Sequence, residues 1–391
     1  MEDAVKFPQD GRSSPSPVDT ELPVRVASAE NTRATLGTTA IIFLLFITVG
    51  ATTQLMNTAI GIWFTELFVF LGVAWVRLRT SGKDPVRYAG LVLPPWRTGA
   101  FGFALGVANF FALVIPTQFL AQSIAPQAWR DQWDMTNLFK NQTPLELGAI
   151  IAAVVLAAPV CEEFVFRGML QRGLAAAINP RAAAVLSAFI FSAFHLDPVG
   201  FAARFELGLV FGLLFLRTNS LWPGILAHAA NNLISTVLYF GFNGAQTADA
   251  ERTSWRAALT VALFGLALLA RLAALARTEP SVLQPARLAP SPAETKPIQR
   301  RSALRPWVMG ALAMLAFLAL ADRRGLVLGW YDLAYHLPPL GKSATQQQKE
   351  DRERLEALRK QARAGNVPLE AYRALREELF RQARQTGNDS G

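Results

Sequence analysis

The sequence is poor in cysteine and in charged side chains. Its single cysteine, Cys161, cannot form an intrachain disulfide, so cysteine usage does not indicate a redox compartment. Charged residues make up only 17% of the 391 positions, against 52% apolar residues. Because the longest apolar runs approach the length of a helix that crosses about 30 Å of hydrocarbon, a soluble protein is not expected.

The sequence also lacks a cleavable signal peptide. Residues 1–34 form a polar N-terminal segment without the short apolar stretch that such a peptide needs. We therefore expect the first membrane helix to direct insertion. The net charge of +9 comes from Lys and Arg between the apolar runs and in the tail. This pattern is typical of loops against an anionic cytoplasmic membrane surface and argues against nucleic acid as a partner.

The apolar runs predict an all-α fold, a polytopic transmembrane helical bundle of about eight or nine helices in the plasma membrane. The expected helices are 36–56, 59–77, 98–121, 145–167, 182–196, 199–216, 222–241, 255–276 and 306–322. The first eight form a bundle over 35–276, and the ninth lies in 305–322, beyond a Pro-rich basic linker over 277–304. The fifth helix is short, so we expect it to pair tightly with the sixth across a bend at Asp197-Pro198.

Basic segments set the predicted orientation. Lys and Arg cluster after the second helix and again after the eighth, and the positive-inside rule places both clusters and the N-terminus in the cytoplasm. A ninth crossing would then put the C-terminus outside, whereas Arg323 and Arg324 directly after it favour retention. The sequence therefore leaves open whether the ninth helix crosses the membrane or re-enters it.

The segment 345–386 is rich in charge and predicts a small soluble helical hairpin. Its apolar residues recur at helical spacing, with a break at 365–368. They are Leu355, Leu358, Tyr372, Leu375 and Leu379. The hairpin resembles short C-terminal oligomerisation motifs of bacterial membrane proteins, which predicts self-association, and a solvated charged helix pair is the alternative.

Three of the apolar helices carry polar side chains that hydrocarbon should exclude. The fourth helix ends in Glu162, Glu163 and Arg167. An ionised group at mid-membrane costs about 2.5 to 3.5 kcal/mol on insertion scales, and the apolar residues of this helix offset only part of that cost. Glu163 and Arg167 are four residues apart and can pair on one face, with Glu162 turned roughly 100° away. A purely structural ion-pair cluster at the interface is the alternative.

The fifth helix carries Phe191 and His195, and the seventh carries His228 and Asn232. Because the fourth and fifth helices form an antiparallel hairpin, Glu162 and His195 should lie at similar depth. His228 and Asn232 are one turn apart and can donate two hydrogen bonds from one face, although interhelical hydrogen bonding explains them too. Two of only three histidines thus lie in membrane helices together with a carboxylate pair, which favours a functional site.

These residues spell Glu-Glu-x-x-x-Arg, Phe-x-x-x-His and His-x-x-x-Asn, in that order. The pattern resembles the three motifs of the CPBP family, the CAAX prenyl protease type 2 and bacteriocin-processing group of intramembrane endopeptidases. The resemblance covers about 145–240 and implies a peptidase core there. It extends neither to the Pro-rich linker nor to the charged tail.

The resemblance implies a role for each motif residue. Glu162 would be the general base for a water that His195 positions or polarises. His228 and Asn232 would stabilise the tetrahedral oxyanion. The residues implied to support them are Glu163, Arg167 and Phe191.

The sequence leaves the cofactor open. Glu162, His195 and His228 could supply the carboxylate and two histidines of a catalytic zinc site. Because the chain has no His-Glu-x-x-His helix, the usual local metalloprotease signature, we favour a metal-free glutamate mechanism and keep zinc as the alternative. The expected partners are the lipid bilayer and a peptide or lipidated peptide. A non-catalytic scaffold or immunity protein, or a proton-coupled transporter using Glu66, are the competing interpretations.

Overall fold

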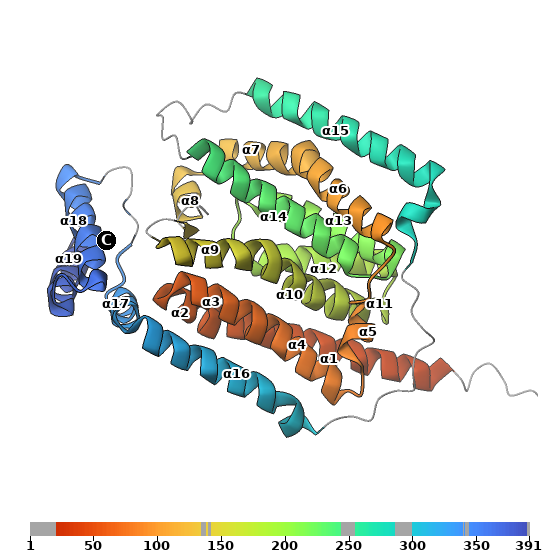
Figure 1. The fold of residues 1–391 in the computed structure, drawn as a ribbon, viewed down its shortest axis with the longest axis horizontal. Coiled ribbons are helices and arrows are strands. Elements are labelled where there is room, and N and C mark those ends of the chain that lie inside the picture. The colour runs from red at the N-terminus through yellow and green to blue at the C-terminus, as the bar shows by residue number, and fades with distance from the viewer. Residues whose placement is uncertain are drawn as a thin grey trace, which may run out of the picture.

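In the computed structural model the described residues are 21–133, 138–139, 142–243, 255–285, 299–338, 340 and 344–388. Within these ranges every regular element is a helix (Figure 1), which confirms the all-α prediction. Helical stretches long and apolar enough to cross a membrane lie at Asn31–Met56, Thr58–Thr80, Trp96–Ile124, Pro144–Ala175 and Trp255–Thr278, and a shorter apolar helix lies at Pro180–Phe194. The chain is therefore an integral membrane protein with a helical bundle.

The first half of the bundle contains three long membrane helices, each interrupted by a π-helical segment. Their parts are α1 (Glu21–Leu45), η1 (Phe46–Gly50) and α2 (Ala51–Met56), then α3 (Thr58–Phe64), η2 (Thr65–Gly72) and α4 (Val73–Thr80), then α6 (Trp96–Asn109), η3 (Phe110–Val114) and α7 (Ile115–Ile124). Short helices α5 (Pro85–Ala89) and α8 (Gln127–Gln132) lie in the connections. The first helix begins at Glu21, so part of the predicted polar segment 1–34 is helical, and residues 1–20 lie outside the described ranges.

The second half carries the motif residues. It consists of α9 (Pro144–Ala152), η5 (Ala153–Ala157), α10 (Ala158–Glu163), η6 (Phe164–Gln171) and α11 (Arg172–Ala175), followed by α12 (Pro180–Phe194), α13 (Phe201–Thr218), α14 (Trp222–Asn243), α15 (Trp255–Thr278) and η7 (Pro280–Leu283). The fourth membrane helix was predicted to end at 167, and this is wrong, because it continues to Ala175. The helix continues past Arg167 because α13 packs against it and accepts hydrogen bonds from it: Arg167 and Gln171 each donate to one of its carbonyls at 3.0 Å.

The helix that carries Glu162 and Glu163 lies at the centre of the apolar core. Phe164, Val165, Phe166, Met169 and Leu170 are all buried in the largest apolar cluster of the described residues. Aromatic rings from η2 and α12 pack against this segment from two sides. The helix that supplies the carboxylates is therefore enclosed by protein, which separates its charged groups from lipid.

Two glycines bring α6 into close contact with α14. Gly102 and Gly106 lie one turn apart on α6, and a Cβ at either position would collide with the backbone of α14 at Pro223 or Ala227. Small residues spaced four apart allow this kind of backbone contact between membrane helices. The segment of α14 that precedes His228 is thus fixed by direct backbone packing.

The helix after the Pro-rich linker runs along the bundle. α16 (Arg300–Ala321) starts earlier than the predicted 305 and contains Pro306 inside the helix. It packs against α3 and α4 and ends beside α2, at the end of the bundle opposite α5 (Figure 1). It therefore extends along the bundle from one end toward the other, as a ninth crossing requires. The side of the membrane on which the C-terminus lies stays a prediction.

A small helical module follows α16. It contains α17 (Arg323–Ala334), which the sequence analysis did not predict, and the predicted hairpin of α18 (Gln346–Ala364) and α19 (Leu369–Asn388). The hairpin turns at Gly365, whose φ of 87° lies in the left-handed region that favours glycine. Leu355 and Tyr372 of the hairpin are buried against Leu328 of α17. The apolar face that suggested self-association is thus covered within the chain, and self-association stays a prediction.

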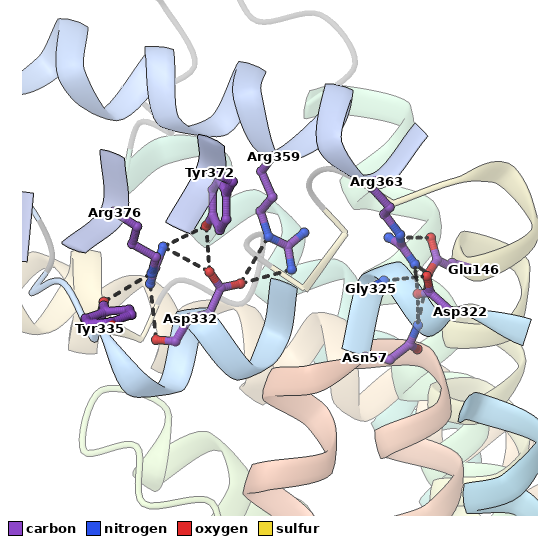
Figure 2. Close-up of polar contacts among 10 residues, drawn as sticks. All are labelled: Asn57, Glu146, Asp322, Gly325, Asp332, Tyr335, Arg359, Arg363, Tyr372 and Arg376. Atoms are coloured by element: carbon purple, nitrogen blue, oxygen red, sulfur yellow. Dashed lines mark hydrogen bonds and ion pairs between the residues drawn. The ribbon is translucent and has the colours of Figure 1, made fainter. Parts of the chain in front are cut away.

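Polar contacts hold this module to the bundle (Figure 2). Arg363 of α18 pairs with Glu146 near the start of α9 and with Asp322, the N-cap of α17. Asn57, between α2 and α3, donates to both carboxylates at 3.2 Å. Although burial by itself lowers the pKa of Arg363, the hydrogen bonds to Glu146 and Asp322 raise it above its ordinary value. Within the module, Asp332 binds two arginines and accepts the hydroxyl of Tyr372 at 2.6 Å.

Candidate active site

The predicted ion pair is present at the core of the bundle. Arg167 Nη1 lies 2.8 Å from Glu163 Oε1, and the two side chains are 0% and 1% exposed. Arg167 also donates to Gly208 O at 3.0 Å, and its guanidinium lies 4.6 Å from the ring centre of Phe191 and 5.3 Å from that of Phe211. A buried ion pair persists only when further contacts help to satisfy its charges, and here a carbonyl and two rings contribute, although Arg167 Nε and Glu163 Oε2 have no hydrogen-bond partner in the protein.

His228 of α14 lies between the two glutamates. Its Nδ1 is 3.2 Å from Glu163 Oε1, and its Nε2 is 3.8 Å from Glu162 Oε2. The ring stacks on Phe211 with 5.0 Å between ring centres. Since a carboxylate accepts, Nδ1 carries a hydrogen, and Nε2 can donate only when the imidazole is doubly protonated.

Glu162 is a buried carboxylate that the protein compensates only in part. It is 9% exposed, and its Oε2 is buried without a hydrogen-bond partner in the protein. Glu66 on η2, a helix that packs against α10, is buried as well and also has an unpartnered Oε2. From the sequence, Glu66 was a candidate for proton transport or for pairing with a neighbouring helix, and its place beside Glu162 was not predicted, because two helices far apart in sequence give no sign that they adjoin.

His195 terminates α12 as its C-cap residue. Its Nδ1 lies 3.0 Å from Phe191 O, and the two rings are 5.1 Å apart. Because a carbonyl oxygen only accepts, Nδ1 carries the hydrogen and Nε2 has a free lone pair. Phe191 also contacts His228 with 5.9 Å between ring centres, so this motif phenylalanine touches both histidines. His195 and Glu162 themselves share no direct hydrogen bond.

Asn232 of α14 is hydrogen-bonded to the helix that carries Glu162 and Glu163. Its Nδ2 donates to Val154 O at 2.9 Å, and its Oδ1 accepts from Asn231 at 3.1 Å. In η5 the N–H of Ala158 bonds back to Ala153 O, so the next donor in register for Val154 O is residue 159, a proline without an N–H. Asn232 therefore supplies the hydrogen bond that the helix cannot. One Nδ2 hydrogen is left for another acceptor.

Asn231, the residue before Asn232, has a buried Oδ1 without a hydrogen-bond partner in the protein and was not among the predicted site residues. The signal for it was weak, since an asparagine pair on a membrane helix is explained equally well by interhelical hydrogen bonding.

The arrangement of the side chains does not decide whether the site holds zinc. Among the described residues no three His, Cys, Asp or Glu side chains are grouped to hold a metal ion. The Nδ1 atoms of both histidines are turned to protein acceptors, which leaves their Nε2 atoms as the nitrogens that a metal could use. The choice between a glutamate and a metal mechanism stays a prediction.

Buried carboxylates facing histidines from neighbouring membrane helices define a class of site suited to hydrolysis within the membrane. Residues 144–234, which hold all three motifs, match the family model of Rce1-like type II CAAX prenyl endopeptidases. The chain is also similar to "Putative membrane peptidase YdiL" of Bacillus subtilis (strain 168), with 25% identity over 193 residues, 48% of this chain and 75% of that protein. No solved structure matches. These findings support the CPBP family and confirm the resemblance drawn from the motifs.

Proposed function

We propose that the protein is an intramembrane endopeptidase that hydrolyses a peptide bond with a water activated by Glu162. The family match supports a membrane endopeptidase of the CAAX type. The observation that carries the finer proposal is the buried, unpartnered Oε2 of Glu162 next to the Nε2 of His228. A carboxylate without a partner in a protein interior is costly unless a substrate or a water uses it.

The proposed reaction uses Glu162 first as a base and then as an acid. Glu162 removes one proton from the water, while the other hydrogen stays on the oxygen and donates a hydrogen bond to the lone pair of His195 Nε2, so that the oxygen faces the scissile carbonyl carbon. The oxyanion that forms accepts from the free Nδ2 hydrogen of Asn232 and from Nε2 of His228. When the C–N bond breaks, the proton on Glu162 passes to the leaving amine. The products are an amine and a carboxylic acid, which then releases its proton to solvent, and Glu162 is restored.

The proposed substrates are peptides or lipidated peptides that reach this site from the bilayer. The family name of the matched segment points to prenylated C-terminal peptides. We propose this chemistry as the first to be assayed, with unmodified membrane-bound peptides as the second.

Replacing the base tests the proposal. Glu162→Gln keeps the shape of the side chain and removes the base, so the rate of peptide hydrolysis should fall by about 100 to 10,000-fold while the protein still purifies as a single species. Glu206→Gln is the matched control, because Glu206 is also a membrane-helix glutamate, bonded to Asn109 at 3.1 Å and outside the three motifs. A Glu162→Gln rate within threefold of wild type would remove Glu162 from the mechanism.

A further inference from the structure

The turn between α12 and α13 begins directly after His195, and its backbone is strained. Leu196 has a φ of 54°, the left-handed region that usually requires glycine at a helix C-terminus. The Leu196 side chain is 50% exposed, so its burial offers little compensation. A non-glycine residue holds such a conformation only when its surroundings fix it.

Asp197 supplies those surroundings. Its Oδ1 accepts from the N–H of Val199 at 2.8 Å and from that of Gly200 at 3.1 Å. Its Oδ2 pairs with Arg204, which folds back over the turn where a Cβ at Gly200 would collide with the guanidinium. Asp197 itself is buried. Both carboxylate oxygens of Asp197 therefore have partners. The sequence predicted only a bend at this position.

A second contact closes the turn from the α12 side. Ser192 Oγ donates to Phe201 O at 2.7 Å, which joins the last turn of α12 to the first residue of α13. The N–H groups of His195 and Leu196 bond back to Ser192 and Ala193. The backbone at His195 is therefore fixed on both sides, and so is the bond from its Nδ1 to Phe191 O that selects one tautomer.

We propose that Asp197 is a positioning residue for the peptidase reaction: with Arg204 it holds Leu196 in the left-handed conformation and thereby keeps His195 in the tautomer whose Nε2 lone pair faces the reacting water. The proposal rests on the proposed function, because it gives His195 the water-holding role. The turn held by Asp197 and Arg204 is a property of the fold, and its effect on the His195 tautomer can be measured without any turnover of substrate.

The test has a spectroscopic arm. Because the chain has only three histidines, protein labelled with ¹⁵N-histidine in micelles should give three imidazole spin systems, assignable with one His→Gln variant each. In the wild type we expect His195 to show a protonated Nδ1 and an unprotonated Nε2. In Asp197→Ala the two shifts should move toward each other as the tautomers exchange, and Asp197→Asn, which keeps the Oδ1 acceptor, should resemble the wild type.

The kinetic arm uses the same variants. Asp197→Ala should lower kcat at least tenfold and change KM less than threefold, and Asp197→Asn should recover most of kcat. Leu196→Gly should keep kcat, whereas Leu196→Val, which tolerates the left-handed region poorly, should behave like Asp197→Ala. The matched control is Asn179→Ala, which removes a similar side-chain cap at the other end of α12 and should leave kcat unchanged.

The outcomes separate the two proposals. An unchanged His195 spectrum and kcat in Asp197→Ala, or averaged tautomers in the wild type, would overturn the positioning role even if Glu162 proves essential. A shifted His195 spectrum in a protein that hydrolyses no peptide would support the positioning device and count against the proposed function alone. A loss of kcat equal in Asn179→Ala and Asp197→Ala would also overturn the positioning role, since it would reduce Asp197 to a general stabiliser of α12.

Discussion

The ion pair between Glu163 and Arg167 permits a quantitative prediction about stability. Removing one partner of a buried pair costs about 3 to 5 kcal/mol, because the other charge is left uncompensated. Arg167→Met should fall near the upper end of that range, since it also loses the contacts with Phe191 and Phe211. Glu163→Gln should fall near the lower end, since the amide oxygen can still accept from Arg167 and His228.

The double variant Glu163→Gln with Arg167→Met leaves no orphaned charge. If the singles cost about 3 to 5 kcal/mol each, independent effects would sum to roughly 6 to 10 kcal/mol. We expect the double variant instead to lose less than either single, which is a coupling free energy of at least about 3 kcal/mol.

Equilibrium unfolding in mixed micelles, followed by far-UV circular dichroism, measures this coupling. The control is Arg373 with Glu377 on α19, which has the same four-residue spacing but lies at the surface with 3.9 Å between Nε and Oε2, and it should show no measurable coupling. A Glu163 and Arg167 double variant whose loss equals the sum of the singles would refute the reasoning.

Three further predictions follow from the described contacts. Asn232→Ala should lower the free energy of unfolding by about 1 to 3 kcal/mol, because Val154 O loses its donor. It should also lower turnover about 100-fold. A fully active but less stable enzyme would refute the oxyanion role. Protein purified without added metal should stay active in chelator, and stoichiometric zinc with activity lost in chelator would reverse this. Burial and then the charge of Asp332 raise the pKa of Tyr372. The native module therefore keeps a proton that the unfolded chain loses near pH 10, and its resistance to proteolysis should fall as the pH rises above about 10, less so in Tyr372→Phe.

The sequence predicted the long apolar helices well, because hydrocarbon thickness limits their length directly. It placed the end of the fourth helix too early, since Arg167 looks like an interfacial residue in isolation. In the structure Arg167 and Gln171 donate to the carbonyls of Gly208 and Gly212, about forty positions later in the chain, and only the tertiary structure brings these together. The same reason explains the omission of α17, whose stability depends on the buried contact of Leu328 with the hairpin.

In the site, the spacing of residues along one helix was sufficient to predict a contact within that helix. It was not sufficient to predict contacts between helices. The four-residue separation predicted the pairing of Glu163 with Arg167, which the structure contains. It could not reveal that Glu163 also binds His228, or that Asn232 compensates for the missing N–H of Pro159. The sequence predicted the bend at Asp197 but not the conformation of Leu196 before it, because a left-handed leucine is set by its neighbours in space and has no signature of its own.

The close packing of α6 on α14 helps to set the position of His228, although α6 carries none of the three motifs. Gly106 faces Ala227, the residue before His228, with no room for one added carbon. A methyl group there would have to push α14 sideways, and a displacement of about 1 Å at a reacting group can reduce a rate roughly 100-fold. If His228 acts as proposed, the clearance between these two backbones, on a helix that carries no motif residue, should limit the rate of the proposed reaction.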